Sequence, residues 1–109
     1  MPTEPQLVSP EDAAHRVSAG AVLIDVRSQA GREANGSIPG ALVTDRDDLD
    51  ARFGSGGITE PSTPIVVICG SVAGSRPVVE ALLGRGYSDV VHVAGGFAAW
   101  AGAGLPTAR

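Results

Sequence analysis

Five short apolar runs alternate along the chain with segments whose apolar residues recur at helical spacing. The runs predict strands at 6–8, 21–27, 41–43, 65–68 and 89–93. The run at 65–68, Ile-Val-Val-Ile, contains no polar residue, which is typical of a strand covered on both faces. Such alternation of strands and helices predicts an α/β fold, with a mostly parallel sheet of about five strands and helices on both faces.

Helices are expected after each of these strands. The segment from Ser9 to Asp12 favours a helix start, because a serine cap precedes proline at the first helical position and two acids that suit the helix dipole. This helix is expected to bury its alanines and Val17 and to stop at Gly20. The other helices are expected at 28–34, at 45–53, from Ser75 as N-cap to about Leu83, and from Phe97 to Ala101, with a surface loop at 54–63.

The single cysteine, Cys69, directly follows the central apolar strand and precedes a helix. Ligands of α/β sheets bind at the carboxyl ends of the strands, so the thiol lies where a site is expected. Backbone N–H groups of the intervening loop, together with the positive end of the helix dipole, favour the thiolate over the thiol. The alternative is an inert buried cysteine that packs as a small hydrophobe, and this stretch alone leaves both interpretations open.

Composition narrows the class of protein. Hydrophobic residues make up 43% of the 109 positions, which favours a folded domain over disorder. The net charge of −4 gives no electrostatic reason to bind nucleic acid or an anionic membrane surface. No apolar run has the length of a bilayer span, and neither a secretory signal nor an internal disulfide is expected, which favours the cytoplasm.

The two histidines and the tryptophan are the remaining candidates for a functional role. His15 and His92 are far apart in the sequence and form no metal-ligand cluster with Cys69, so neither a metal nor a cofactor is expected. His92 alternates with valines and is expected to be packed or exposed at an edge rather than to act as a base. Trp100 is expected to anchor the core.

Several motifs, in order, resemble the rhodanese-like domain family over nearly the whole chain. The segment 23–27, Leu-Ile-Asp-Val-Arg, is similar to the family's first signature. The segment 36–41 is similar to its glycine–histidine–isoleucine–proline–glycine–alanine turn, with Ser37 at the histidine position. The C-terminal signature matches from Gly86 through the glycine pair at 95–96 to Trp100 and the Gly-Leu-Pro at 104–106. The resemblance implies one rhodanese-like domain over residues 1–109.

A sulfurtransferase activity is what this resemblance implies. The family's cysteine, here Cys69, attacks a sulfane sulfur such as that of thiosulfate and becomes a persulfide, which passes its outer sulfur to cyanide, a thiol or a partner protein. The implied partners are a small sulfur-containing anion and a thiol or protein acceptor, without nucleic acid or membrane. Asp25 and Arg27 are implied as structural residues near the site. The implied substrate-binding residues are Gly70, Ser71, Val72, Ala73, Gly74, Ser75 and Arg76.

The loop after Cys69 departs from the family pattern of cysteine, two residues, glycine, one residue, arginine and serine. Val72 takes the glycine position and Gly74 the arginine position. Because valine resists positive φ, the loop is expected to follow another path, with Gly70 and Gly74 supplying flexibility. Arg76 is displaced from the family's arginine position at Gly74; it either pairs with an anion in the loop or is a solvated surface residue.

Three functions from different classes remain open. The first is a thiosulfate sulfurtransferase-like enzyme, which the retained Cys69 favours. The second is a catalytically weak binding or regulatory module, which Val72 and the missing loop arginine favour. The third is a cysteine-dependent phosphatase or arsenate reductase, whose loop places five residues between cysteine and arginine. Six residues separate Cys69 from Arg76, so this function ranks last.

Overall fold

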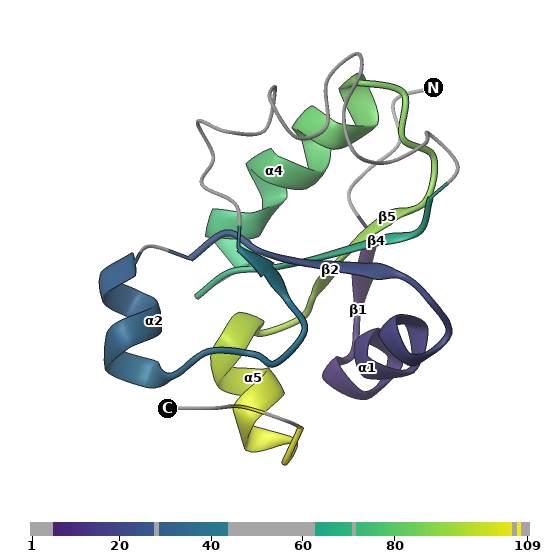
Figure 1. Ribbon diagram of the computed structural model, residues 1–109. Coiled ribbons are helices and arrows are strands. Elements are labelled where there is room, and N and C mark those ends of the chain that lie inside the picture. Colours follow the sequence, from purple (N-terminus) through teal and green to yellow (C-terminus); the bar gives the residue numbers. More distant parts are fainter. Residues whose placement is uncertain (1–5, 28, 44–62, 71, 106, 108–109) are drawn as a thin grey trace.

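A five-stranded sheet forms the centre of the fold in the computed structural model (Figure 1). The structure describes residues 6–27, 29–43, 63–70, 72–105 and 107, with the backbone alone at 29, 32, 35 and 72–74. The elements in chain order are β1 (Gln6–Val8), α1 (Pro10–Ser18), β2 (Val22–Asp25), α2 (Gln29–Asn35), β3 (Leu42–Val43), β4 (Ile65–Ile68), α4 (Val72–Gly84), β5 (Val90–Val93) and α5 (Gly96–Gly102).

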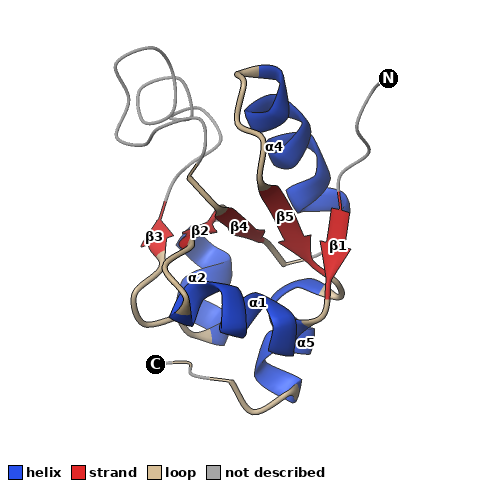
Figure 2. Cartoon of the chain, turned by 90° about the vertical axis from the view of Figure 1, so that its right-hand side faces the viewer, coloured by secondary structure: helices blue, strands red, loops and turns tan. Residues whose placement is uncertain are grey.

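The sheet has the strand order β1-β5-β4-β2-β3, and all four pairings are parallel. Figure 2 shows β4 at the centre of this order and the short strands β1 and β3 at its two edges. In the register, Val67 of β4 lies beside Ile24 of β2 on one side and His92 of β5 on the other. The expected parallel α/β architecture of about five strands is therefore confirmed.

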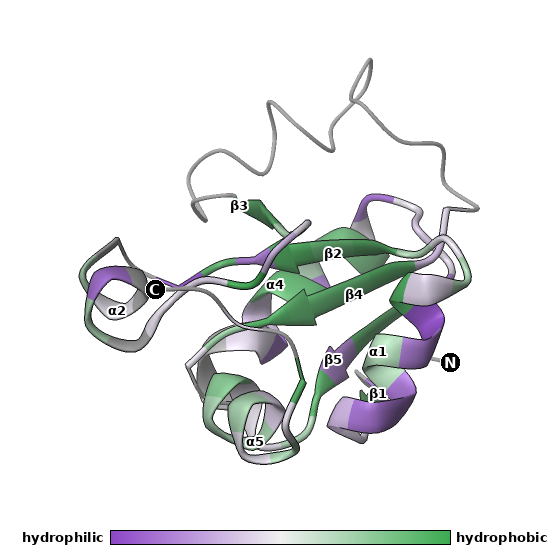
Figure 3. Cartoon of the chain, turned by 60° about the horizontal axis from the view of Figure 1, so that its bottom comes forward, coloured by the Kyte–Doolittle hydropathy of each residue, from purple (hydrophilic) through white to green (hydrophobic). Residues whose placement is uncertain are grey.

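Helices cover both faces of the sheet, as expected from its apolar central strand. All four residues of β4 are buried, and Figure 3 shows this strand as hydrophobic along its length. Alternate strand residues point to opposite faces, so one sequence run supplies two cores. Helix α4 packs over one face with Val78, Val79 and Leu82, whereas α1 and α5 cover the other face, where Phe97 and Trp100 are buried.

Helix α1 begins as its sequence predicts. The Ser9 side chain accepts a hydrogen bond from the backbone N–H of Asp12 at 3.1 Å, and Pro10 is the first helical residue. Ala13 is fully buried against the sheet. The helix ends at Ser18, and Gly20 follows with a left-handed φ of 115°, so the predicted stop is also confirmed.

Helix α4 differs from its prediction at the N-terminus. The sequence places the N-cap at Ser75, but the helix begins at Val72, and Ser75 is its fourth residue. Pro77 accordingly lies inside the helix rather than in its first turn. Serine and proline are common at helix starts, which is why the sequence predicts the start here. In the structure, a tertiary contact of Ser75, described below, accounts for the burial of this residue.

Two predicted segments, the helix at 45–53 and nearly all of the loop at 54–63, lie outside the described residues. Within the described part of the chain, none of the helices is both long enough and apolar enough to cross a bilayer.

Candidate functional site

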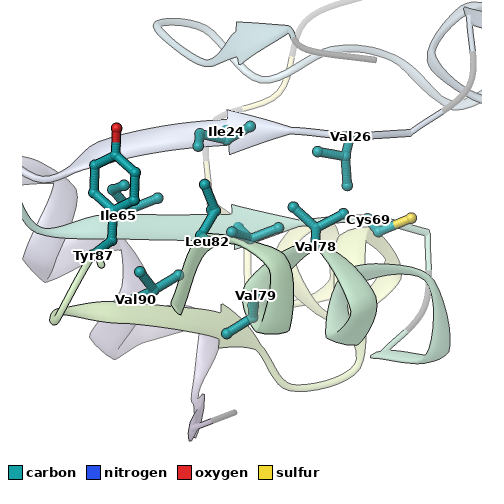
Figure 4. Packing of buried hydrophobic residues seen from close by; sticks show 10 residues of the cluster. Ile24, Val26, Ile65, Cys69, Val78, Val79, Leu82, Tyr87 and Val90 are labelled. Carbon is teal, nitrogen blue, oxygen red and sulfur yellow. The ribbon is translucent and has the colours of Figure 1, made fainter. Parts of the chain in front are cut away.

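Cys69 leaves the central strand at its carboxyl end and is held there by its backbone. The carbonyl of Ile68 accepts a hydrogen bond from the N–H of Val26 at 3.0 Å, and the carbonyl of Cys69 accepts one from the N–H of Phe97 at 2.8 Å. The residue is 8% exposed and belongs to the core cluster beneath α4. In Figure 4 its sulfur lies at one end of this cluster and is directed away from Val78.

A close backbone contact supports Cys69 from the α5 side. Gly96, the first residue of α5, has a left-handed φ of 64°. A Cβ at this position would lie 2.7 Å from the carbonyl oxygen of Cys69 and 2.9 Å from the carbonyl carbon of Gly70. Both observations require glycine, since only a residue without a side chain permits this approach at this φ. In the sequence, Gly95 and Gly96 are only the glycine pair of the C-terminal signature, and nothing there indicates the contact with Cys69.

The helix that follows Cys69 starts only three residues later, at Val72. The first N–H groups of a helix have no intrahelical acceptor and carry the positive end of the dipole, so they can hold an anion. Ser71 lies outside the described residues, and the side chains of Val72, Ala73 and Gly74 are not described. Their proposed contact with substrate therefore stays a prediction.

Val72 avoids positive φ, as expected, but the described glycines of the loop do not supply the alternative path. Gly70 does not adopt a left-handed φ, and Gly74 lies within α4. Val72 is helical, and no non-glycine residue among those described has a positive φ. The loop accommodates valine by starting the helix early, because a β-branched residue tolerates helical φ but not positive φ.

Ser75 and His92 form a buried polar pair under α4. The Ser75 hydroxyl and the His92 Nδ1 are 2.7 Å apart, and the two residues are 1% and 2% exposed. His92 lies in β5, an interior strand, so of the two expected environments the packed one is confirmed. The sequence offers one signal for this pair, a histidine inside a valine strand, but nothing in it indicates the partner.

Arg76 points outward from α4. Its side chain is 54% exposed, and its Nε lies 3.9 Å from a carboxylate oxygen of Glu80, one helical turn further on. This is an exposed i,i+4 ion pair, which contributes little to stability and leaves the guanidinium accessible. A role in binding an anion stays a prediction for Arg76.

Asp25 and Arg27 form a buried ion pair on the opposite face of the sheet. The guanidinium donates to both carboxylate oxygens of Asp25 at 2.8–3.1 Å, and the backbone N–H of Arg27 donates to one of them. Arg27 also donates to the carbonyl of Gly36 at 2.8 Å and lies 3.9 Å over the centre of the Phe97 ring. The pair thus joins the end of β2 to the segment after α2 and to α5.

The part of the chain that the structure describes contains no candidate metal centre. No group of three or more histidine, cysteine, aspartate or glutamate side chains there could hold a metal ion. The chemistry available in the described region therefore centres on Cys69, backbone N–H groups and the two buried polar pairs.

Known proteins match this chain over most of their length. The family model described as the rhodanese-like domain matches residues 9–103. A thiosulfate sulfurtransferase GlpE from Pseudomonas syringae is 34% identical over 98 residues, covering 90% of this chain and 89% of that protein. A protein of the same name from Haemophilus influenzae is 31% identical over 100 residues, covering 91% and 90%.

Solved structures show the same fold. The rhodanese-like domain of an Anabaena protein superposes with a TM-score of 0.78 at 30% identity, covering 96% of this chain and 79% of that one. A polysulfide-sulfur transferase homodimer from Wolinella succinogenes has a TM-score of 0.80 at 26% identity, covering 94% and 77%. A Rhodopseudomonas palustris protein of unknown function, described as a possible tyrosine phosphatase, has a TM-score of 0.81 at 26% identity, covering 94% and 84%. With its motifs, its parallel sheet and its sulfurtransferase relatives in agreement, the chain belongs to the rhodanese-like domain family.

Proposed function

We propose that this protein is a sulfurtransferase that carries sulfane sulfur on Cys69. The donor is a small sulfur-containing anion such as thiosulfate, and the acceptor is cyanide, a thiol or a protein thiol. The proposal is supported by relatives named thiosulfate sulfurtransferase that align over about nine-tenths of the chain. The observation that carries it is the position of Cys69, between the end of the central strand and the start of α4.

The reaction proceeds in two balanced transfers. The Cys69 thiolate attacks the outer sulfur of thiosulfate, the S–S bond of the donor breaks, and sulfite leaves with the bonding electron pair. Cys69 is then a persulfide with a terminal anionic sulfur. Cyanide attacks this outer sulfur, the persulfide S–S bond breaks, thiocyanate leaves, and the thiolate is restored. Neither step requires a metal, and the proton of the original thiol goes to solvent.

Backbone groups of the segment 70–74 are assigned to holding the anionic sulfur. The first N–H groups of a helix point out of its N-terminal end, and α4 begins three residues after Cys69 in the sequence. Such preorganised donors stabilise negative charge without a separate base. The outward-facing Arg76 is assigned to attracting the anionic donor, because its guanidinium is accessible and only weakly held by Glu80.

A direct test follows the fate of one sulfur atom. The protein is incubated with thiosulfate, its intact mass is measured, and thiocyanate is quantified after cyanide is added, with Cys69→Ser as the matched control. We expect the wild-type protein to gain one sulfur atom, to lose it to cyanide and to form thiocyanate repeatedly. The serine variant is expected to do none of these. Absence of sulfur gain with thiosulfate, mercaptopyruvate and an alkyl persulfide would refute the proposal.

The assignment of Arg76 has a test of its own. Arg76→Gln is expected to raise KM for thiosulfate about threefold, with little change in kcat, because an exposed charge contributes a few tenths of a kcal/mol to binding an anion. The effect is expected to vanish in high salt. An unchanged KM at low ionic strength makes Arg76 a solvated surface residue.

A catalytically weak binding module is the second candidate. The observation that favours it is that the cation nearest to Cys69 in the following sequence, Arg76, points outward and pairs with Glu80. This candidate predicts no sulfur gain by Cys69 in the mass measurement above. Turnover of an aryl phosphate in the same preparation would instead indicate phosphatase chemistry.

A further inference from the structure

The buried Ser75–His92 pair has no part in the sulfur transfer described above. An imidazole in an interior strand between valines is unusual, because burying a polar ring is unfavourable by about 1–3 kcal/mol unless it is hydrogen-bonded. An apolar residue would fill the same place in β5 without a partner. Buried polar contacts of this kind specify one packing arrangement among several, so the question is which arrangement this one selects.

The bond reaches the N-terminal turn of α4. Ser75 is the fourth residue of the helix, directly after the turn at 72–74 whose N–H groups have no intrahelical acceptors. His92 lies beside Val67 of β4, two residues before Cys69. The contact therefore fastens the first turn of the helix to the strand next to the one that carries the cysteine.

Pro77 makes this turn depend on an external contact. Because proline has no N–H, the helical hydrogen bond from residue 77 to the carbonyl of residue 73 does not form. The start of α4 is thus held by fewer internal bonds than an ordinary helix of its length. A side-chain bond from Ser75 to a rigid interior strand compensates for this loss.

A single stretch of chain holds both ends of the loop that follows Cys69. At one end, Gly96 and the N–H of Phe97 contact the backbone of Cys69 and Gly70. At the other end, His92 bonds Ser75 at 2.7 Å. Residues 92–97 run continuously from β5 into α5, so the two contacts fix the helix start relative to the cysteine backbone.

We infer that His92 is a positioning residue, which acts through Ser75 to hold the N–H groups at the start of α4 around the sulfur of Cys69. His92 does not touch the substrate in this account. When the bond is removed, the turn at 72–74 shifts or fluctuates, and the donors no longer converge on the anionic sulfur. The inference rests on the proposed function only where rates of sulfur transfer are concerned.

The test compares three single variants, one double variant and a control. His92→Leu keeps most of the volume and removes the bond, and Ser75→Ala removes it from the other side. His92→Asn restores it, because an asparagine amide group is the same number of bonds from the backbone as Nδ1. Val90→Ala is the control, since Val90 is buried on the same face of the same strand but lies two residues away from the contact.

Two measurements distinguish an effect on the position of the helix start from an effect on the stability of the fold. The first is the rate of alkylation of Cys69 by iodoacetamide as a function of pH, which needs no sulfurtransferase activity. The second is kcat and KM for thiosulfate. Urea unfolding ensures that every variant is compared under conditions where it is folded.

We expect His92→Leu and Ser75→Ala to slow alkylation at neutral pH about fivefold, to move its pH midpoint upward and to lower kcat more than they raise KM. His92→Asn is expected to regain most of the rate, and the double variant His92→Leu/Ser75→Ala to be no slower than either single variant. Val90→Ala is expected to lower stability without moving the pH midpoint.

The inference is overturned if folded His92→Leu alkylates with the wild-type rate and pH midpoint, or if His92→Asn is as slow as His92→Leu. If His92→Leu does not fold, Ser75→Ala removes the same bond by deleting one oxygen atom and decides the matter in the same way. Should the wild type fail to accept sulfur, the proposed function fails, while the alkylation measurements still decide whether His92 positions the turn.

Discussion

The two faces of the sheet each carry a buried polar pair near the end of the strands, and the pairs differ in chemistry. Asp25 and Arg27 are charged, two residues apart, and joined by several hydrogen bonds of 2.8–3.1 Å. Ser75 and His92 are seventeen residues apart and joined by one side-chain contact of 2.7 Å. Both pairs connect the sheet to segments that lie next to Cys69.

The difference shows how each pair contributes. A buried charge must be neutralised and fully hydrogen-bonded, so the Asp25–Arg27 pair is surrounded by partners, including the Gly36 carbonyl and the Phe97 ring. A hydroxyl and an imidazole need fewer partners, so their contact can control the position of one helix turn at a smaller energetic cost. The charged pair is expected to govern stability, and the Ser75–His92 pair the geometry around the cysteine.

The largest effect is expected from breaking the charged pair. Asp25→Ala leaves the Arg27 guanidinium buried without its carboxylate and is expected to lower the free energy of unfolding by about 3–5 kcal/mol. Urea unfolding followed by circular dichroism measures it. The double variant Asp25→Leu/Arg27→Met is expected to recover part of this loss, because no buried charge remains. A loss under 1 kcal/mol for Asp25→Ala contradicts the assignment.

The next effect concerns Gly96, the glycine that lies against the backbone of Cys69 and Gly70. Gly96→Ala combines a left-handed φ with a Cβ 2.7 Å from the Cys69 carbonyl oxygen, and is expected to lower stability by about 2–4 kcal/mol. It is also expected to slow alkylation of Cys69, because the loop must move. Gly104→Ala, which has a similar φ of 77° and open space around it, is the control and isolates the cost of φ alone.

A smaller loss of stability is expected from the neutral pair. Ser75→Ala leaves the His92 ring without its Ser75 contact inside the core, and is expected to lower the free energy of unfolding by about 1–3 kcal/mol. Hydrogen exchange measured by mass spectrometry is expected to increase, relative to the wild type, more at the start of α4 than at its end. An equal increase along the whole of α4 contradicts the view that the pair holds the N-terminal turn.

The smallest effect is expected from another serine-to-alanine substitution, at an exposed site. Ser9→Ala deletes the hydroxyl that accepts from Asp12 and caps α1, and is expected to cost about 1 kcal/mol. Because Ser9 is exposed, water replaces the lost partner, and the alkylation rate of Cys69 is expected to stay at the wild-type value. Urea unfolding and alkylation of this variant therefore calibrate both readouts for Ser75→Ala.

Much of the fold is predictable because its determinants are local. The all-apolar run 65–68 becomes the central strand, and the Ser9 cap starts α1 as expected. The start of α4 is mispredicted, because Ser75 and Pro77 carry the local signature of a helix start, whereas the structure places both inside the helix and Ser75 in contact with His92 of β5. A pattern within ten residues cannot distinguish a capping serine from one that is bonded to a distant strand.

The candidate site likewise has some features that the sequence predicts and others that it does not. The proposed nucleophile comes from the sequence, since Cys69 is the only cysteine and follows a strand among the family motifs. The ion pair of Asp25 and Arg27 is half predictable, because residues two apart on a strand share a face. The support of Cys69 by Gly96 and the bond between Ser75 and His92 are not predictable, since they join segments that meet only when the sheet has formed.

By itself, then, the sequence determined the parallel α/β architecture, the family and the choice of Cys69 as the proposed nucleophile, because these depend on residue type, periodicity and order along the chain. Only the tertiary structure decided where α4 begins, which glycine must lie against Cys69, and which buried histidine contacts Ser75. The reason is physical: a hydrogen bond or a steric limit is set by distances between atoms, and residues far apart in sequence acquire those distances only through packing.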